Sequence, residues 1–168
     1  MKETGLLLGI ASEGSVGPDP VVPFIHSNIE HLVLVDDEKG IIISEIHRSF
    51  EITAATITAA PDQDLTPFLE KADFPTHALI VRPNTQIESN CIKGVNNLEQ
   101  LQEAIAISSK LSPNGFVVIE SDLRAMQSPS RQRNIEEVAK LLARRVSQLC
   151  PNCQMPGWGR VGYVKGLI

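Results

Sequence analysis

The alternation of apolar and polar residues predicts a strand-rich first part of the chain. Residues 5–10, GLLLGI, form a short apolar run, and a loop rich in glycine and proline, ASEGSVGPDP, follows it. HLVLV, residues 31–35, is a second apolar run, after which DDEKG predicts a turn with Gly40 available for a positive φ. Residues 41–53 alternate with a period of two, as a strand with one buried face does. Strand, turn and strand together predict an antiparallel hairpin.

Strands and helices alternate in the second part of the chain. Continuous apolar runs predict buried strands, and apolar positions three or four residues apart predict helices. The predicted elements are a helix at 64–72 with Asp64 as N-cap, a strand at 77–83, a helix at 96–111 capped by Asn97, a strand at 116–120, and a helix at 128–149 with Ser128 as cap and Pro129 in its first position. Strand–helix–strand connections favour parallel pairing.

The predicted fold class is therefore α/β. We expect a mixed sheet with helices packed on it, made of an N-terminal antiparallel meander and C-terminal parallel strand–helix units. A single domain is expected over residues 1–149. Residues 150–168, with four glycines and two prolines, are expected to form an irregular tail.

Composition narrows the class of protein without identifying it. Hydrophobic residues make up 42% of the 168 residues and charged residues 21%, as in soluble globular proteins. No apolar run approaches the roughly 18 residues of a membrane span, so we expect no membrane partner. Three cysteines, two of them in one Cys-x-x-Cys, indicate a reducing compartment, and we expect a cytoplasmic protein.

Charge is distributed unevenly along the chain. Residues 1–123 hold 18 acidic and 7 basic side chains, a net charge of −11, whereas residues 124–168 hold 2 acidic and 8 basic side chains, a net charge of +6. A basic C-terminal quarter suits phosphate or nucleic acid. The alternative, which we favour, is that it packs on the acidic part of its own chain or on another subunit of a homo-oligomer.

The segment VIESDLRAMQSPSRQR, residues 118–133, holds the main candidate site. Asp122 and Arg124 follow a predicted buried strand, and a helix is predicted to start at Ser128. Ligands bind beyond the carboxyl ends of parallel strands, and a helix N-terminus suits an anion. Arg131 and Arg133 add positive charge there. In the alternative reading, Asp122 and Arg124 pair with each other and the two later arginines meet acidic groups.

Glu13, in the loop after the first strand, is a second candidate. It could share a divalent cation with Asp122 if their strands are neighbours. The loop lacks the Lys-Ser/Thr of a P-loop. The alternative is that Glu13 accepts backbone N–H bonds.

The sequence shows no motif of a nucleophilic enzyme. GxSxG is absent, and neither a Ser-His-Asp nor a Cys-His arrangement is recognisable. The four histidines have neither HxxxH nor HxH spacing. We expect His77, which precedes a buried strand, to be hydrogen-bonded at the strand end.

CPNCQMPGWG, residues 150–159, resembles one half of a zinc knuckle. A structural zinc ion takes four ligands in a tetrahedron, and Cys150 and Cys153 supply two. We therefore expect a half-site without ordered zinc, unless two chains pair their knuckles around one ion.

Several segments together resemble a bacterial family of uncharacterised proteins, catalogued as a domain of unknown function. They are GIASEGSVGPDP, EHLVLVDDEKG, FPTHALIVRP, ESDLRAMQSPSRQRNIEEVAKLLARRVSQLCPNCQMPGWG and KGL. The resemblance implies no established activity. The positions that match the family pattern and are candidates for a site are Glu13, Asp122, Arg124, Pro129 and Arg131.

The chain also departs from this family. In similar proteins the two main motifs read SEGSFGPHP and TDMRAHMNPTR; here Val16 replaces the aromatic residue, Asp19 the histidine, and residues 126–128 the stretch His-Met-Asn. Family members carry further sequence before the first loop and a second Cys-x-x-Cys-Gly after the position of Leu167. The resemblance thus implies a chain shortened at both ends.

We expect the protein to bind a phosphate-bearing small molecule at Asp122, Arg124, Ser128, Arg131 and Arg133, with Glu13 opposite and a divalent cation as a possible cofactor. If it is an enzyme, paired carboxylates and arginines favour metal-assisted hydrolysis or phosphoryl transfer, with Asp122, Arg124 and Glu13 as the catalytic residues. One alternative is a non-catalytic module that binds nucleic acid or a protein through the basic C-terminal helix. Another is a fragment that needs its lost N-terminal part to act.

Overall fold

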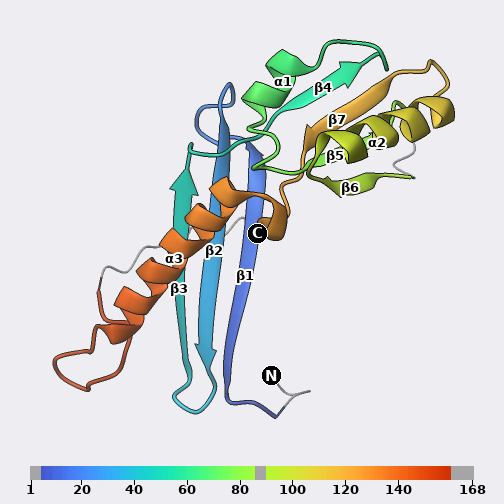
Figure 1. The fold of residues 1–168 in the computed structure, drawn as a ribbon. Coiled ribbons are helices and arrows are strands. Elements are labelled where there is room, and N and C mark those ends of the chain that lie inside the picture. The colour runs from blue at the N-terminus through green and yellow to red at the C-terminus, as the bar shows by residue number, and fades with distance from the viewer. Residues whose placement is uncertain (1–4, 86–89, 160–168) are drawn as a thin grey trace. The chain divides into compact units, whose positions relative to one another are not determined.

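A computed structural model describes residues 5–85 and 90–159 of the chain. Within them the chain forms two antiparallel sheets and three α-helices, so the predicted α/β class is confirmed (Figure 1). The chain divides into two compact units. The first unit comprises Met1–Ser15, Ile29–Arg48 and Asn134–Ile168, and the second comprises Val16–Asn28 and Ser49–Arg133.

The first sheet has three strands in the order β1-β2-β3: β1 (Leu8–Pro18), β2 (His26–Asp36) and β3 (Ile41–Ser49). The predicted hairpin is confirmed: Asp36 Oδ1 accepts the Lys39 N–H at 2.9 Å in the turn, and Gly40 has φ +64°. The prediction that ASEGSVGPDP forms a loop is wrong, because β1 continues through most of this segment to Pro18. Glycine and proline are tolerated there because β1 is an edge strand.

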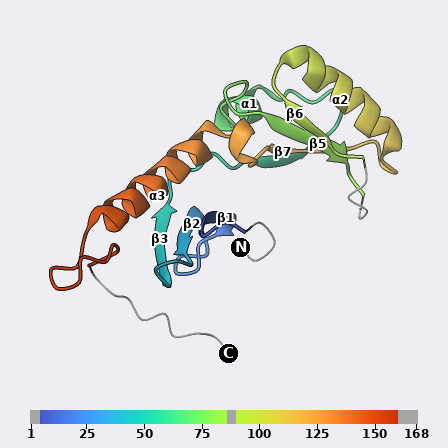
Figure 2. The same cartoon turned by 90° about the horizontal axis from the view of Figure 1, so that it is seen from below.

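The helix α3 (Pro129–Ser147) starts at the predicted residue. Its last four turns belong to the first unit, where they lie along the three-stranded sheet (Figure 2). Val138 and Leu142, four residues apart on this helix, are buried. Residues 150–159 follow α3 and contain a turn closed by a bridge between Leu149 and Pro156.

The second sheet has four strands in the order β4-β7-β5-β6: β4 (Thr56–Ala59), β5 (Leu79–Pro83), β6 (Ile92–Val95) and β7 (Val117–Ser121). Every neighbouring pair is antiparallel, so the predicted parallel strand–helix units are wrong. The reason is β6, a four-residue strand that the sequence pattern did not reveal. It reverses the chain between β5 and the next helix, and this reversal makes β7 antiparallel to β5.

Two helices accompany this sheet, α1 (Thr66–Lys71) and α2 (Leu98–Leu111). The side chain of Asn97 caps α2 as predicted, accepting the Gln100 N–H at 2.9 Å. The N-cap of α1 is Leu65, one residue after the predicted Asp64, whose Oδ1 accepts the Thr66 N–H. The core lies between α2 and the central strands and contains Leu79, Val81, Val117, Ile119, Leu101, Ala104 and Ile105. Among the described residues, none of the helices has the length and apolar character needed to cross a membrane.

Candidate functional site

Asp122 and Arg124 form an ion pair directly after β7. The Asp122 side chain is 0% exposed, and its Oδ2 lies 2.6 Å from Arg124 Nη2. Arg124 Nε also donates to Oδ1 at 2.9 Å, so the guanidinium meets the carboxylate with its Nε–Nη2 edge. The Asp122 N–H donates to the carbonyl of Ala78, the residue before β5, at 2.8 Å. The central strands therefore fix the position of Asp122, and Asp122 fixes Arg124.

Gly94 completes the surroundings of this carboxylate. The β5–β6 register passes from Leu79↔Val95 to Ile80↔Lys93, which leaves Gly94 as the extra residue of a bulge with φ +75°. Its N–H, released from the sheet ladder, donates to Asp122 Oδ2 at 3.1 Å. A bulge of this kind needs glycine at the left-handed position. The short strand β6 thus supplies a backbone donor to the site.

Asp122 is ionised at neutral pH. Burial opposes the charged form, but the hydrogen bonds from the Arg124 side chain and backbone, the Arg124 charge and the Gly94 N–H outweigh it, so the pKa of Asp122 lies below its usual value. The same pairing raises the pKa of Arg124. The structure therefore gives Asp122 the role of holding Arg124, which is the alternative reading of the sequence.

The loop between β7 and α3 is ordered by further bonds. It contains a short 3₁₀ helix, η1 (Ala125–Gln127), whose last carbonyl accepts the Ala78 N–H at 3.1 Å. Arg131, in the first turn of α3, reaches back so that its Nη1 donates to the Leu123 carbonyl at 2.9 Å. Arg124 nevertheless keeps 45% of its side chain exposed. The loop therefore presents an arginine that is held in place and accessible to solvent.

The start of α3 does not offer an open set of N–H groups. Ser128 precedes the helix as predicted, and its carbonyl accepts the Gln132 N–H at 2.9 Å. The Ser130 N–H donates to His77 Nε2 at 3.1 Å. An anion at this helix start would have to replace the imidazole, so the expected contribution of the N-terminus to anion binding is reduced.

His77 belongs to a group that the sequence did not predict. It is hydrogen-bonded before a strand, as expected: its Nδ1 lies 2.9 Å from Asp73 Oδ2, and its Nε2 lies 3.0 Å from Ser130 Oγ. A Ser-His-Asp arrangement is therefore present, although none was recognisable in the sequence. His77 and Ser130 are 53 residues apart and share no local spacing; the fold brings the segment before β5 to the start of α3.

The other predicted carboxylate, Glu13, belongs to the other unit. Glu13 is exposed on β1 in the first unit, whereas Asp122 belongs to the second unit. Both oxygens of Asp122 already accept hydrogen bonds. Within residues 5–85 and 90–159, no three His, Cys, Asp or Glu side chains could together hold a metal ion. The divalent cation stays a prediction that these contacts do not support.

Residues 148–158 give Cys150 and Cys153 a defined geometry. The Cys150 N–H donates to the Met155 carbonyl at 2.8 Å, and Leu149 bridges to Pro156. Backbone N–H groups of Cys153 and Asn152 donate to the Cys150 sulfur and lower the pKa of its thiol. The half-site stays a prediction, and the segment after residue 159 lies outside the described residues.

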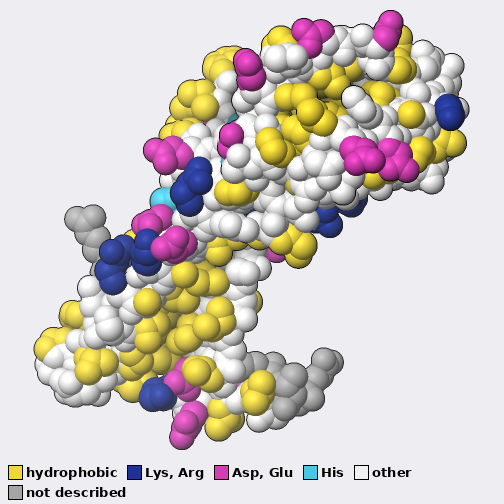
Figure 3. Space-filling view, in the orientation of Figure 1, with side chains coloured by type: hydrophobic (Ala, Val, Ile, Leu, Met, Phe, Trp, Pro, Cys, Tyr) yellow, Lys and Arg dark blue, Asp and Glu magenta, His cyan; other side chains and the backbone are white. Residues whose placement is uncertain are grey.

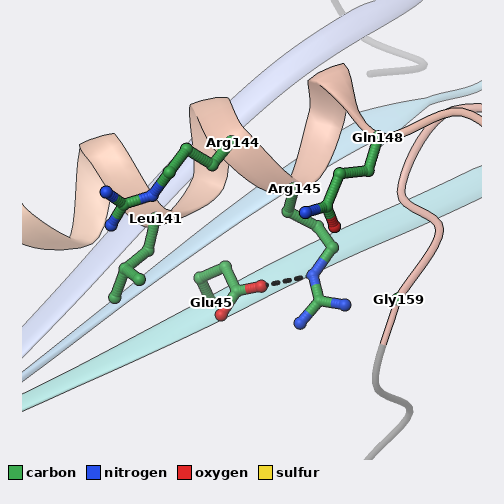
Figure 4. Close-up of a pocket in the computed structure, with 6 residues that line it drawn as sticks. All are labelled: Glu45, Leu141, Arg144, Arg145, Gln148 and Gly159. Atoms are coloured by element: carbon green, nitrogen blue, oxygen red, sulfur yellow. Dashed lines mark hydrogen bonds and ion pairs between the residues drawn. The ribbon is translucent and has the colours of Figure 1, made fainter.

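A cavity of about 380 Å³ lies between β3 and the end of α3 in the first unit (Figure 4). Arg145 and Gln148 extend from α3 toward it, and Arg145 Nε donates to Glu45 Oε1 of β3 at 2.5 Å. Two side chains that could recognise a ligand are thus already engaged with each other. The cavity is lined by Glu45, Leu141, Arg144, Arg145, Gln148 and Gly159.

A second cavity, of about 340 Å³, lies in the second unit between β6 and α2. Its lining is mostly apolar, with Lys93, Gln100 and Glu103 as the charged or amide side chains. Gly94 lines this cavity, and a Cβ added to Gly94 would lie 3.5 Å from Arg124 Nη2. The bulge residue therefore adjoins both the cavity and the arginine.

Fold and site define an α/β protein in which a buried aspartate holds a partly exposed arginine on the loop before the longest described helix. The sequence comparisons place the chain in a family. Residues 1–168 match the family model described as "Domain of unknown function (DUF6671)", and the chain belongs to this family. No curated protein and no solved structure matches the chain. The family description names no activity, so the functional argument rests on the geometry.

Proposed function

We propose that the loop between β7 and α3 binds a phosphate-bearing small molecule through Arg124. The observation that supports this proposal is the side-on pairing of Arg124 with a fully buried aspartate while 45% of the arginine side chain remains exposed. The pair uses Nε and Nη2, and therefore leaves Nη1 for another acceptor. An arginine oriented in advance loses little conformational freedom when it binds an anion.

Asp122 acts in this proposal as the residue that positions Arg124. Its oxygens accept bonds from Arg124 and Gly94, which leaves it poorly suited to hold a metal ion or to remove a proton. The cavity beside Gly94 offers room for the apolar part of a ligand. Arg133, exposed in the second turn of α3, adds positive charge without a fixed geometry.

The test is titration of the purified chain with inorganic phosphate and with pyrophosphate, followed by calorimetry. Arg124→Lys is the informative variant because lysine keeps the charge opposite Asp122 but lacks the Nη1 donor. Loss of one hydrogen bond to a charged group corresponds to roughly a tenfold weaker affinity. Arg144→Lys, a matched change in the first unit, should bind as the unchanged protein does.

Two results would contradict the proposal. One is that neither anion binds at millimolar concentration. The other is that Arg124→Lys binds both anions as tightly as Arg144→Lys, with circular dichroism showing that both variants are folded. Arg124→Ala is less suitable because it leaves Asp122 buried without its partner.

A further inference from the structure

Three side chains of the second unit form a continuous hydrogen-bonded series that joins the segment between α1 and β5 to the start of α3. Ser130 Oγ lies 3.0 Å from His77 Nε2, and His77 Nδ1 lies 2.9 Å from Asp73 Oδ2. Ser130 and His77 are each 2% exposed. A hydroxyl within reach of an imidazole that a carboxylate orients is the arrangement of an activated nucleophile.

The backbone shows which nitrogen of His77 is available as a base. The Ser130 N–H donates to Nε2 at 3.1 Å, and an N–H group can donate only to a nitrogen that has no proton. The ring proton therefore resides on Nδ1 and is donated to Asp73. In this tautomer Nε2 is the nitrogen that can take a proton from a serine hydroxyl. Its single lone pair accepts the Ser130 N–H in the structure, so this backbone bond breaks when Nε2 takes the proton from Oγ.

Ser130 also has a favourable place in the helix. It is the second residue of α3, which has 19 residues. The positive end of the helix dipole stabilises negative charge that develops at or near Ser130 Oγ during attack. The sequence around Ser130 lacks the Gly-x-Ser-x-Gly motif, in which a sharp turn presents the nucleophilic serine. Here the start of α3 holds the serine instead.

The cover over Ser130 is an irregular segment between β3 and β4. The Thr53 N–H donates to Ser130 Oγ at 3.1 Å. Two residues later the segment is fixed on β7, where the Ala55 N–H donates to Ser121 Oγ at 3.0 Å and the Ser121 N–H donates to the Ala55 carbonyl at 2.9 Å. Displacement of residues 51–54 breaks the bond to Ser130 and keeps the anchor. Substrate access needs this displacement, as in enzymes with mobile loops over the active site.

We propose that Ser130 and His77 are the catalytic residues of an esterase site and that Asp73 positions His77. His77 Nε2 takes the Ser130 proton while Oγ bonds to the ester carbonyl carbon, and the carbonyl electron pair moves to oxygen. Return of that pair expels the alcohol, which leaves with the proton from His77. Water, activated by His77, then releases the acid and restores Ser130. The substrate class is a carboxylic ester, and the proposal does not depend on phosphate binding at Arg124.

The competing explanation is that His77 only caps α3. Ser130→Ala separates the two, because alanine keeps the backbone N–H bond to Nε2 and removes only the hydroxyl. The fold should therefore survive in this variant whichever explanation holds, while any reactivity of the hydroxyl disappears.

The experiment is reaction of the full chain with a fluorophosphonate probe, with the modified residue located by mass spectrometry. We expect an adduct on Ser130 that is absent from Ser130→Ala and unchanged in Ser108→Ala, which removes another buried serine of the same unit. His77→Gln should slow labelling at least about 100-fold. Asp73 is 57% exposed, so Asp73→Asn should stay folded and yet label at least about tenfold more slowly.

The labelling results distinguish an esterase site from a histidine that only caps α3. Absence of any adduct on the unchanged protein, or an adduct that persists in Ser130→Ala, overturns the proposal. Labelling of Ser130 at the same rate in Asp73→Asn and in the unchanged protein, with matching circular dichroism, also overturns it. Hydrolysis of p-nitrophenyl acetate that is lost in Ser130→Ala would support it.

Discussion

Asp122→Asn tests whether the buried charge, rather than the shape of the side chain, stabilises the second unit. Asparagine keeps the volume but replaces one oxygen by an NH₂ group that faces donors from Arg124 or Gly94. Removing one partner of a fully buried ion pair costs about 3–5 kcal/mol. Here the remaining charge of Arg124 stays partly in water, because 45% of its side chain is exposed. We therefore expect the free energy of unfolding to fall by about 2 kcal/mol. For a chain of this size that corresponds to a melting temperature roughly 4–8 °C lower.

The pH dependence gives the sharper readout. The pKa of Asp122 is lowered in the folded protein, so its stabilisation is fully present above the usual aspartate value of about 3.9 and is lost as the pH falls through the lower folded value. A protonated Asp122 is neutral, as asparagine is. The difference in free energy of unfolding between the unchanged protein and Asp122→Asn should therefore be largest near pH 7 and shrink below pH 4.

Urea unfolding followed by circular dichroism at pH 7 and at pH 3 measures this difference. Hydrogen exchange at the Gly94 amide, which donates to Asp122, gives a local reading and should become faster in the variant. Asp62→Asn, at an exposed position of the same unit, is the control and should leave the unfolding curve unchanged. Equal stabilities at pH 7, or a difference of the same size at both pH values, would refute the reasoning.

Two further predictions concern the backbone and the knuckle. Gly94→Ala places a side chain on a residue with φ +75°, with its Cβ 3.4 Å from Gln127 Nε2, and should lower the free energy of unfolding by at least about 1–2 kcal/mol. Gly115 has the same φ and no atom within 4 Å of an added Cβ, so Gly115→Ala measures the cost of the backbone conformation alone. Equal losses in the two variants would show that the contact with Gln127 contributes nothing. Backbone N–H donors lower the pKa of the Cys150 thiol, so iodoacetamide should alkylate it at lower pH than an ordinary thiol of pKa about 8.5. Mass spectrometry of the Cys153→Ser variant measures this reaction, and a curve that coincides with that of cysteine in a short peptide would count against the prediction.

Local chemistry made the starts of the two longer helices predictable. Asn97 caps α2 through a bond to a residue three positions later, and Pro129 begins α3 because proline is compatible with the first helical position. The direction of the central strands was not predictable in the same way. Continuous apolar runs mark β5 and β7 as buried, but the run does not show which way a strand points. The direction of β7 relative to β5 depended on β6, whose four residues include a glycine and are too few to show a recognisable pattern.

In the candidate site, too, the local contacts were predictable from the sequence and the distant ones were not. The Asp122–Arg124 pair was among the readings of the sequence because its members are two residues apart. The series of Asp73, His77 and Ser130 was not, because its second bond joins residues 53 positions apart. Gly94 contributes its backbone N–H, and a backbone donor cannot be recognised from the residue type. Side-chain spacing thus predicts contacts within a loop, whereas contacts between loops depend on the order of strands in the sheet.

Several basic side chains of the C-terminal quarter are paired with acidic side chains in the structure. Lys140 pairs with Glu136 and Glu137, and the acidic and basic side chains along α3 stand in mixed groups in Figure 3. Arg145 pairs with Glu45, which lies 100 residues earlier in the chain. Nucleic-acid affinity from counterion release grows with the number of phosphates that basic groups neutralise, and cations already paired contribute little to it. These pairs favour a helix that packs on the sheet of its own unit, and the proposed anion site is the one at Arg124.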